Sequence, residues 1–124
     1  MKKPTVLIVD ADEHSRILLE ETFQMMAQYS KEYQVLSTSF GEEAIHFCHD
    51  YNIELIFTEI HLKDMDGWQL IQKINKLYPS ISIIIQTAVI TDDIAQRVRR
   101  SGADSYIAKP IHIYEMQKKV QRVL

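Results

Sequence analysis

The chain is poor in the residues that mark specialised classes of protein. Its 124 residues include one cysteine, three glycines, three prolines and one tryptophan. The single cysteine, Cys48, excludes an internal disulfide and a zinc site built on several thiolates, and it suits a reducing compartment such as the cytoplasm. The low glycine and proline content excludes collagen-like and low-complexity sequences. We therefore expect a globular protein of cytoplasmic location.

The chain also lacks long apolar runs and a strong excess of either charge. No run approaches the ~18 apolar residues of a membrane-spanning helix, and the short run after Lys2 and Lys3 ends at Asp10, too early for a signal peptide. The net charge is −3, so no general attraction draws the chain to nucleic acid or to an anionic membrane. These absences predict a soluble domain without membrane or nucleic-acid partners.

Short apolar runs alternate with amphipathic stretches over the whole length. Four nearly unbroken runs rich in β-branched residues predict strands covered on both faces, and a more polar run predicts an edge strand. These five runs lie at 6–9, 33–39, 55–57, 83–85 and 106–108. Between them, apolar residues recur at helical spacing, as at Leu70, Ile74 and Leu77, which predicts helices with inward-facing stripes. The alternation indicates one doubly wound α/β domain, residues 1–124, with a parallel sheet.

Polar side chains stand directly after four of the predicted strands. Asp10 follows the first and Glu59 the third, while Thr87 follows the fourth and Lys109 the fifth. Each of them alone has an ordinary explanation as a helix cap, a strand residue or a surface charge. In a parallel sheet, however, ligands bind beyond the carboxyl ends of the strands, where all four would meet. The sequence therefore predicts a polar site made of two carboxylates, a hydroxyl and an ammonium group.

These positions resemble the receiver domain of bacterial two-component response regulators. The resemblance rests on five segments in order, 6–10, 59–67, 87–88, 102–106 and 109–110. It implies a flavodoxin-like sheet of five strands in the order 2-1-3-4-5, with a phosphorylation switch at its carboxyl edge. In the family, an acidic pair after the first strand and the backbone carbonyl at the position of His61 hold Mg²⁺, and a histidine kinase phosphorylates an Asp after the third strand. Thr87, Tyr106 and Lys109 match the switch and phosphate-contact positions.

Two residues depart from the family pattern. Glu59 stands at the phosphoacceptor position, and Ala11 replaces the second acid of the pair, which leaves Asp10 and Asp12 in the acidic pocket. The longer side chain moves the carboxylate by about 1.5 Å, and in-line attack tolerates little misplacement. Mg²⁺ requires hard oxygen ligands in near-octahedral geometry. With Asp10, Glu59 and the His61 carbonyl as candidates, we expect weak or absent metal binding and a degenerate receiver that is not conventionally phosphorylated.

Several roles at this pocket stay open at the level of sequence. Glu59 either pairs with Lys109 and mimics the phosphorylated state, with Tyr106 turned inward, or lies in an inactive pocket of a packing or dimerisation module. Asp12 either supplements the metal ligands or caps the following helix. The resemblance also implies a cis bond between Lys109 and Pro110, which only an X-Pro bond forms at low cost.

The resemblance further implies protein partners and no enzymatic activity. Such partners are a histidine kinase, a phosphotransfer protein or an output domain, and a homodimer would form through the fourth helix, the fifth strand and the last helix. The basic residues on or near this face are Arg97, Arg99, Arg100, Lys118, Lys119 and Arg122. We interpret them as solvated or protein-contacting, since the domain as a whole is acidic.

A different class of protein offers an alternative interpretation. Asp10 and Asp12, separated by Ala11 after an apolar strand, also resemble the nucleophile and general acid of haloacid-dehalogenase-like phosphotransferases. That family needs a further acidic motif after the lysine to hold Mg²⁺, and the only acid beyond Lys109 is Glu115, within the last predicted helix. The receiver interpretation is therefore preferred.

Overall fold

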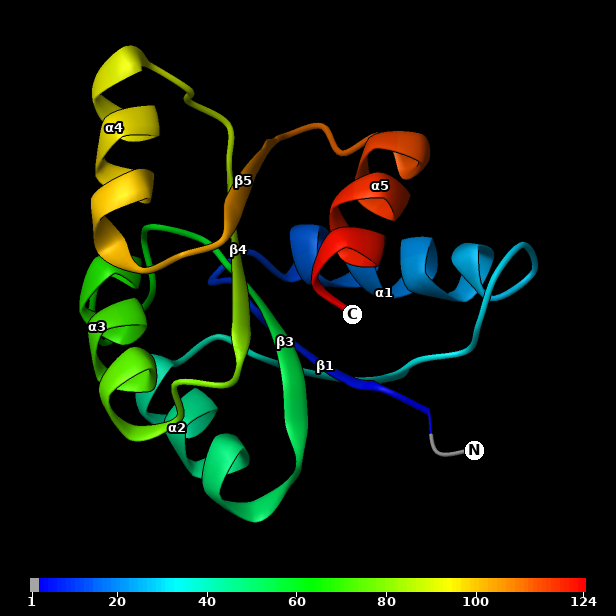
Figure 1. Ribbon diagram of the computed structural model, residues 1–124, viewed down its shortest axis with the longest axis horizontal. Helices are drawn as coiled ribbons and strands as arrows, with labels where there is room; N and C mark the ends of the chain where they lie inside the picture. The colour runs from blue at the N-terminus through cyan, green and yellow to red at the C-terminus, as the bar shows by residue number, and fades with distance from the viewer. Residues whose placement is uncertain (1–2) are drawn as a thin grey trace.

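The computed structural model describes residues 3–124, in which five parallel strands form one sheet in the order β2-β1-β3-β4-β5 (Figure 1). The strands are β1 (Thr5–Val9), β2 (Gln34–Thr38), β3 (Ile53–Thr58), β4 (Ser82–Thr87) and β5 (Ser105–Ala108). The helices are α1 (Glu13–Met26), α2 (Gly41–Asp50), α3 (Gly67–Leu77), α4 (Asp92–Ser101) and α5 (Ile113–Val123). A helix follows every strand, so the doubly wound α/β fold and the expected strand order are confirmed.

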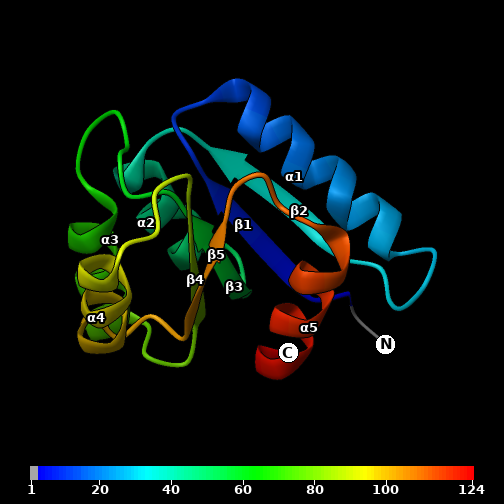
Figure 2. The same cartoon turned by 90° about the horizontal axis from the view of Figure 1, so that it is seen from above.

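The helices cover both faces of the sheet. α1 and α5 lie on one face, and α2, α3 and α4 lie on the other (Figure 2). Each face encloses its own apolar cluster, one including Phe23 and Phe57 and the other including Ile71 and Ile74. The central strands β1, β3 and β4 are almost entirely buried, which explains their unbroken apolar sequences. Within residues 3–124, no helix is long and apolar enough to cross a membrane.

The structure refines two predictions at the ends of elements. β2 is a partly exposed edge strand as expected, but it spans Gln34–Thr38 rather than 33–39. The prediction that Leu77 faces the core together with Leu70 and Ile74 is wrong, because Leu77 is 56% exposed. α3 ends at this residue, so the last position of the stripe lies beyond the packed part of the helix.

Backbone hydrogen bonds extend the sheet by one residue at the edge where the carboxyl ends of the strands meet. The Glu59 amide donates to the Val9 carbonyl at 2.9 Å, which places Glu59 beside the end of β1. The Lys109 amide donates to the Thr87 carbonyl at 2.9 Å, which continues the pairing of β5 with β4. These bonds hold Glu59 and Lys109 at one edge of the sheet, next to Asp10.

Candidate functional site

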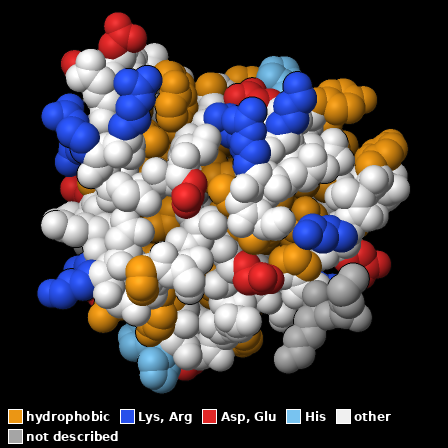
Figure 3. Space-filling model, viewed as in Figure 1, with side chains coloured by type: hydrophobic (Ala, Val, Ile, Leu, Met, Phe, Trp, Pro, Cys, Tyr) orange, Lys and Arg blue, Asp and Glu red, His pale blue; other side chains and the backbone are white. Residues whose placement is uncertain are grey.

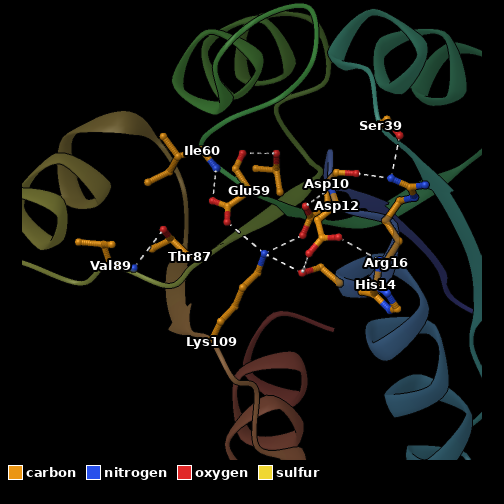
Figure 4. Close-up of polar contacts among 12 residues, drawn as sticks. Asp10, Asp12, His14, Arg16, Ser39, Glu59, Ile60, Thr87, Val89 and Lys109 are labelled. Atoms are coloured by element: carbon orange, nitrogen blue, oxygen red, sulfur yellow. Dashed lines mark hydrogen bonds and ion pairs between the residues drawn. The ribbon is translucent and has the colours of Figure 1, made fainter.

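Lys109 is the centre of a polar cluster at the carboxyl edge of the sheet (Figure 4). Its Nζ lies 2.8 Å from Asp10 Oδ2 and 3.0 Å from Glu59 Oε1, and it donates a hydrogen bond to Ser15 Oγ at 3.1 Å. The Lys109–Pro110 peptide bond is cis, as expected. One ammonium group thus joins residues from the ends of β1 and β3 and from the first turn of α1.

The cluster is largely removed from water. The side chain of Asp10 is 2% exposed, that of Glu59 15% and that of Lys109 19%. Burial acts to lower the pKa of Lys109, but the hydrogen bonds and negative charges of Asp10 and Glu59 outweigh it and raise that pKa above its ordinary value. The ammonium group therefore stays charged at neutral pH and compensates two carboxylates.

Backbone amides satisfy the remaining carboxylate oxygens. Asp10 Oδ1 accepts a hydrogen bond from the Asp12 amide at 2.9 Å, and Glu59 Oε2 accepts one from the Ile60 amide at 2.6 Å. All four oxygens of the two buried carboxylates are thus engaged by groups of the chain itself. Such saturation stabilises charge in a buried site, and it leaves no carboxylate oxygen without a donor.

Asp12 lies at the start of α1 and acts there as the N-cap. Its side chain accepts a hydrogen bond from the His14 amide at 3.1 Å and another from the Ser15 hydroxyl at 3.3 Å. Asp12 therefore reaches the cluster only through Ser15, which also contacts Lys109. Of the two roles left open by the sequence, the structure places Asp12 in the capping role.

The residues present offer an incomplete set of ligands for a magnesium ion. In the part of the chain that the structure describes, no group of three His, Cys, Asp or Glu side chains could hold a metal ion. The oxygens of Asp10 and Glu59 are taken by Lys109 and by backbone amides, and Ala11 supplies no oxygen ligand. His61 has an exposed side chain and forms an isolated backbone bridge with Asp66. A metal ion at this pocket would have to compete with Lys109 and the backbone amides for every carboxylate oxygen.

Within residues 3–124, the side chains of the two switch positions, Thr87 and Tyr106, form no hydrogen bond or ion pair with this cluster. Thr87 is buried, and its hydroxyl accepts a hydrogen bond from the Val89 amide at 3.4 Å, the only contact drawn to that hydroxyl in Figure 4. Tyr106 is half-buried against the apolar cluster of the α2–α4 face, and Lys119 Nζ lies 5.3 Å from the centre of its ring. Tyr106 is therefore neither fully enclosed nor free at the surface.

Two residues of α1 contribute to the site although the sequence pattern did not predict them. Ser15 contacts Lys109, and Arg16 donates hydrogen bonds from Nη1 to the Asp10 carbonyl and to Ser39 Oγ, both at 2.7 Å. Arg16 thereby ties the end of β1 to the segment that follows β2. Both residues lie in the first turn of α1, six and seven residues after the end of β1, and that position was the signal available in the sequence.

The basic residues of α4 and α5 differ in their exposure and contacts. Lys and Arg side chains gather over α4 and α5 in Figure 3. Arg99 and Arg100 of α4 and Lys118 of α5 are exposed. Arg97 is exposed but lies over the Trp68 ring of α3, with its guanidinium carbon 4.6 Å from the ring centre. Lys119 is partly buried at Tyr106 and Ser105.

Gly67 allows the loop after Glu59 to close tightly. Asp66 caps α3 in a capping box with Gln69, and the Gly67 amide donates to the Ile60 carbonyl at 2.5 Å. A Cβ atom at Gly67 would collide with the carbonyl oxygen of Glu59 and press on the backbone of Ile60. Because residue 67 has no side chain, the backbone of Glu59 can lie in close contact with the start of α3.

We expect the substitution Gly67→Ala to destabilise the domain by about 1–3 kcal/mol, the usual cost of overpacking a tight contact. Urea denaturation followed by circular dichroism measures this change. The matched control is Gly41→Ala, where the added Cβ meets only the flexible Met65 side chain. Equal stability losses in the two variants would contradict the proposed backbone contact.

Comparison with known proteins gives one consistent family. Residues 6–121 match the family described as response regulator receiver domain. The chain is 32% identical over 124 residues to "Probable transcriptional regulator ycf27" of Guillardia theta, covering 98% of this chain but 46% of that protein. It is 28% identical to "Sporulation initiation phosphotransferase F" of Bacillus subtilis, covering 100% of this chain and 96% of that one. It therefore spans less than half of the first relative and nearly all of the second.

Solved structures give the same result for the fold. A two-component response regulator from Clostridium difficile matches with a TM-score of 0.86 and 27% identity, over 98% of this chain and 95% of that one. The chemotaxis protein CheY4 of Vibrio cholerae matches with a TM-score of 0.88 and 22% identity, over 99% of this chain and 100% of that one. The arrangement of strands and helices is thus shared beyond the level of sequence similarity.

Proposed function

Since the chain belongs to the family of response regulator receiver domains, which act in two-component phosphorelay signalling, we propose that it is an atypical member whose residue 59 is not conventionally phosphorylated. The observation that carries the proposal is the occupation of the pocket by the chain's own groups. Lys109 bridges Asp10 and Glu59, so the ammonium group already has two carboxylate partners.

Phosphoryl transfer to Glu59 would require a free carboxylate oxygen aligned with the phosphorus atom. Both Glu59 oxygens are engaged, one by Lys109 and the other by the Ile60 amide. Receiver domains typically bind Mg²⁺, and we propose that this one binds it weakly because Ala11 removes an anionic ligand. In this proposal, both the phosphoacceptor position and the metal site are impaired.

The Glu59 carboxylate also offers a substitute for the phosphoryl group that a conventional receiver domain would carry. The Glu59 carboxylate places a permanent negative charge beside Lys109, where a phosphoryl group would carry its charge, although one carboxylate carries less charge and fewer acceptor oxygens. Thr87 and Tyr106 stay outside this contact. We propose that the ion pair holds the domain in one state, which its partners read without a phosphorylation cycle.

The proposed output is protein contact. Receiver domains interact with kinases and phosphotransfer proteins, and we propose partners of this kind, or an output domain, for the present chain. A homodimer through α4, β5 and α5 would use the exposed cations of that face (Figure 3). We propose a cytoplasmic domain without enzymatic activity of its own. The phosphotransferase alternative is disfavoured because Asp12, its general acid, serves as a helix cap.

The proposal is tested by incubating the domain with acetyl phosphate and Mg²⁺ and measuring the intact mass. We expect no added phosphate on the natural chain, because the Glu59 carboxylate is paired and the metal site is incomplete. The double variant Ala11→Asp, Glu59→Asp serves as the positive control, since it restores the family's acids at both positions. Near-stoichiometric, base-labile phosphate on Glu59 would contradict the proposal.

A further inference from the structure

Gln86 carries two buried polar atoms that the rest of the structure does not satisfy. The residue is 0% exposed, and within residues 3–124 neither its Nε2 nor its Oε1 has a hydrogen-bond partner. Burying an amide without partners is unfavourable, and such groups in a native fold call for a specific explanation. No other buried side chain in the described part of the chain shares this condition.

The geometry of β4 directs Gln86 toward the face covered by α1 and α5. Ile83 and Ile85 belong to the apolar cluster under α2, α3 and α4, whereas Ile84 belongs to the cluster under α1 and α5. Side chains alternate along a strand, so Gln86 lies on the same face as Ile84. Its neighbour across the sheet is Ile107. Apolar packing alone would favour an aliphatic residue here, so packing does not account for an amide.

A cavity of about 280 Å³ adjoins Gln86 between α1 and the segment that joins β5 to α5. Its lining residues are Ser15, Leu18, Leu19, Thr22, Gln86, Lys109, Pro110 and Ile111. This volume lies just below the usual range of about 300–1,000 Å³ for small-molecule sites, so it suits a small ligand, and a mostly apolar wall with a few polar groups is the usual composition of such sites.

The other polar groups around the cavity are already engaged. Thr22 donates its hydroxyl hydrogen bond to the Leu18 carbonyl at 2.7 Å. Ser15 Oγ accepts from Lys109 and donates to the Asp12 carboxylate. Lys109 is paired with two carboxylates, so it offers no free charge to an anion. Among the described lining residues, the Gln86 amide therefore remains as the group able to select a ligand.

We propose that this cavity binds a small, neutral molecule with an amide or lactam edge. A side-chain amide presents one donor and one acceptor side by side, and the complementary edge of a second amide satisfies both at once. The leucine, proline and isoleucine walls suit a flat apolar body. Because the Gln86 amide is closed off from water, the ligand must displace a neighbouring apolar side chain, and it then gains two hydrogen bonds without competing with bound solvent.

The site is separate from the pocket of Asp10 and Glu59, although Lys109 borders both. The existence of this cavity therefore does not require residue 59 to be phosphorylated. A ligand seated against the Lys109 side chain would bias the position of its ammonium group, and by linkage the state of the cluster would change the affinity for the ligand.

Benzamide is a suitable probe, because it combines a flat apolar ring with a primary amide. In a ¹⁵N,¹³C-labelled domain, titration with benzamide at millimolar concentration is expected to shift the Gln86 side-chain amide and the methyl groups of Leu18 and Leu19. Benzoate has the same ring but no N–H donor and carries a charge, so it is expected to bind at least tenfold more weakly.

The decisive variant is Gln86→Leu, which keeps a similar size and removes both polar atoms. We expect it to bind benzamide at least tenfold more weakly and to unfold at a higher urea concentration than the natural chain. Gln72→Leu, a substitution at an exposed glutamine of α3, is the matched control and should retain the affinity. Equal affinity in Gln86→Leu would overturn the proposal. So would a natural chain whose Gln86 and leucine resonances do not respond to benzamide, which would indicate that the cavity holds water only.

Discussion

Replacing Lys109 by methionine is expected to lower the free energy of unfolding by about 3–5 kcal/mol, the usual effect of removing one partner from a buried ion pair. Methionine preserves the apolar stem but leaves Asp10 and Glu59 without their shared cation. The two carboxylates are 2% and 15% exposed, so water compensates them poorly. Urea denaturation at pH 7, followed by circular dichroism, measures the change.

Two controls separate this effect from a loss of packing. Adding Glu59→Gln to Lys109→Met removes one of the two carboxylate charges that have lost their cation. The double variant should therefore be more stable than Lys109→Met, because the two sites are coupled. Lys118→Met, at an exposed position of α5, should change stability by no more than about 0.5 kcal/mol. If the double variant is no more stable than Lys109→Met, the ion-pair explanation is wrong.

The pH dependence of Lys109→Met provides a further check of the same prediction. The pKa of Lys109 is raised in the folded state, so its contribution to stability is fully present below the unfolded value of 10.5 and is lost as the pH rises through the folded pKa. The stability difference between the natural chain and Lys109→Met should therefore be constant near neutral pH and shrink in alkaline solution. A difference that persists there would contradict the role of the charge.

Rebuilding the acidic site with Ala11→Asp and Glu59→Asp is expected to increase the affinity for Mg²⁺ by at least tenfold. The first change adds a hard oxygen ligand, and the second shortens the side chain by one methylene, so that residue 59 draws back from Lys109 by about 1.5 Å. Isothermal titration calorimetry with MgCl₂ measures the gain, and the natural chain gives the reference value.

The single variants show which position limits metal binding. Ala11→Asp alone adds a ligand while Glu59 still pairs with Lys109, so it should gain less than the double variant. Asp12→Asn keeps a good N-cap and should leave Mg²⁺ binding unchanged, because Asp12 is engaged at the start of α1. An unchanged Mg²⁺ affinity in the double variant would mean that other parts of the pocket prevent metal binding.

The residue pattern was sufficient to predict a doubly wound α/β fold and the proximity of Asp10, Glu59 and Lys109, whereas the strand order was implied by the family resemblance. Unbroken apolar runs and helical stripes are local features, and right-handed connections leave few arrangements for strands that alternate with helices. The carboxyl ends of parallel strands then lie at one edge, so polar residues at those ends must be neighbours. The prediction that Leu77 faces the core was wrong because periodicity does not show where a helix extends beyond its packing partners.

Packing between distant segments determined the remaining features. Periodicity marks Ser15 and Arg16 only as residues of α1, and their contacts with Lys109 and Ser39 depend on how that helix lies against the sheet. The unsatisfied amide of Gln86 is likewise invisible in a β-strand sequence, since hydrogen-bond partners and cavities arise from several elements together. Local sequence therefore specifies which residues reach the edge of the sheet, whereas the orientation of α1 and α5 specifies which of their polar groups find partners.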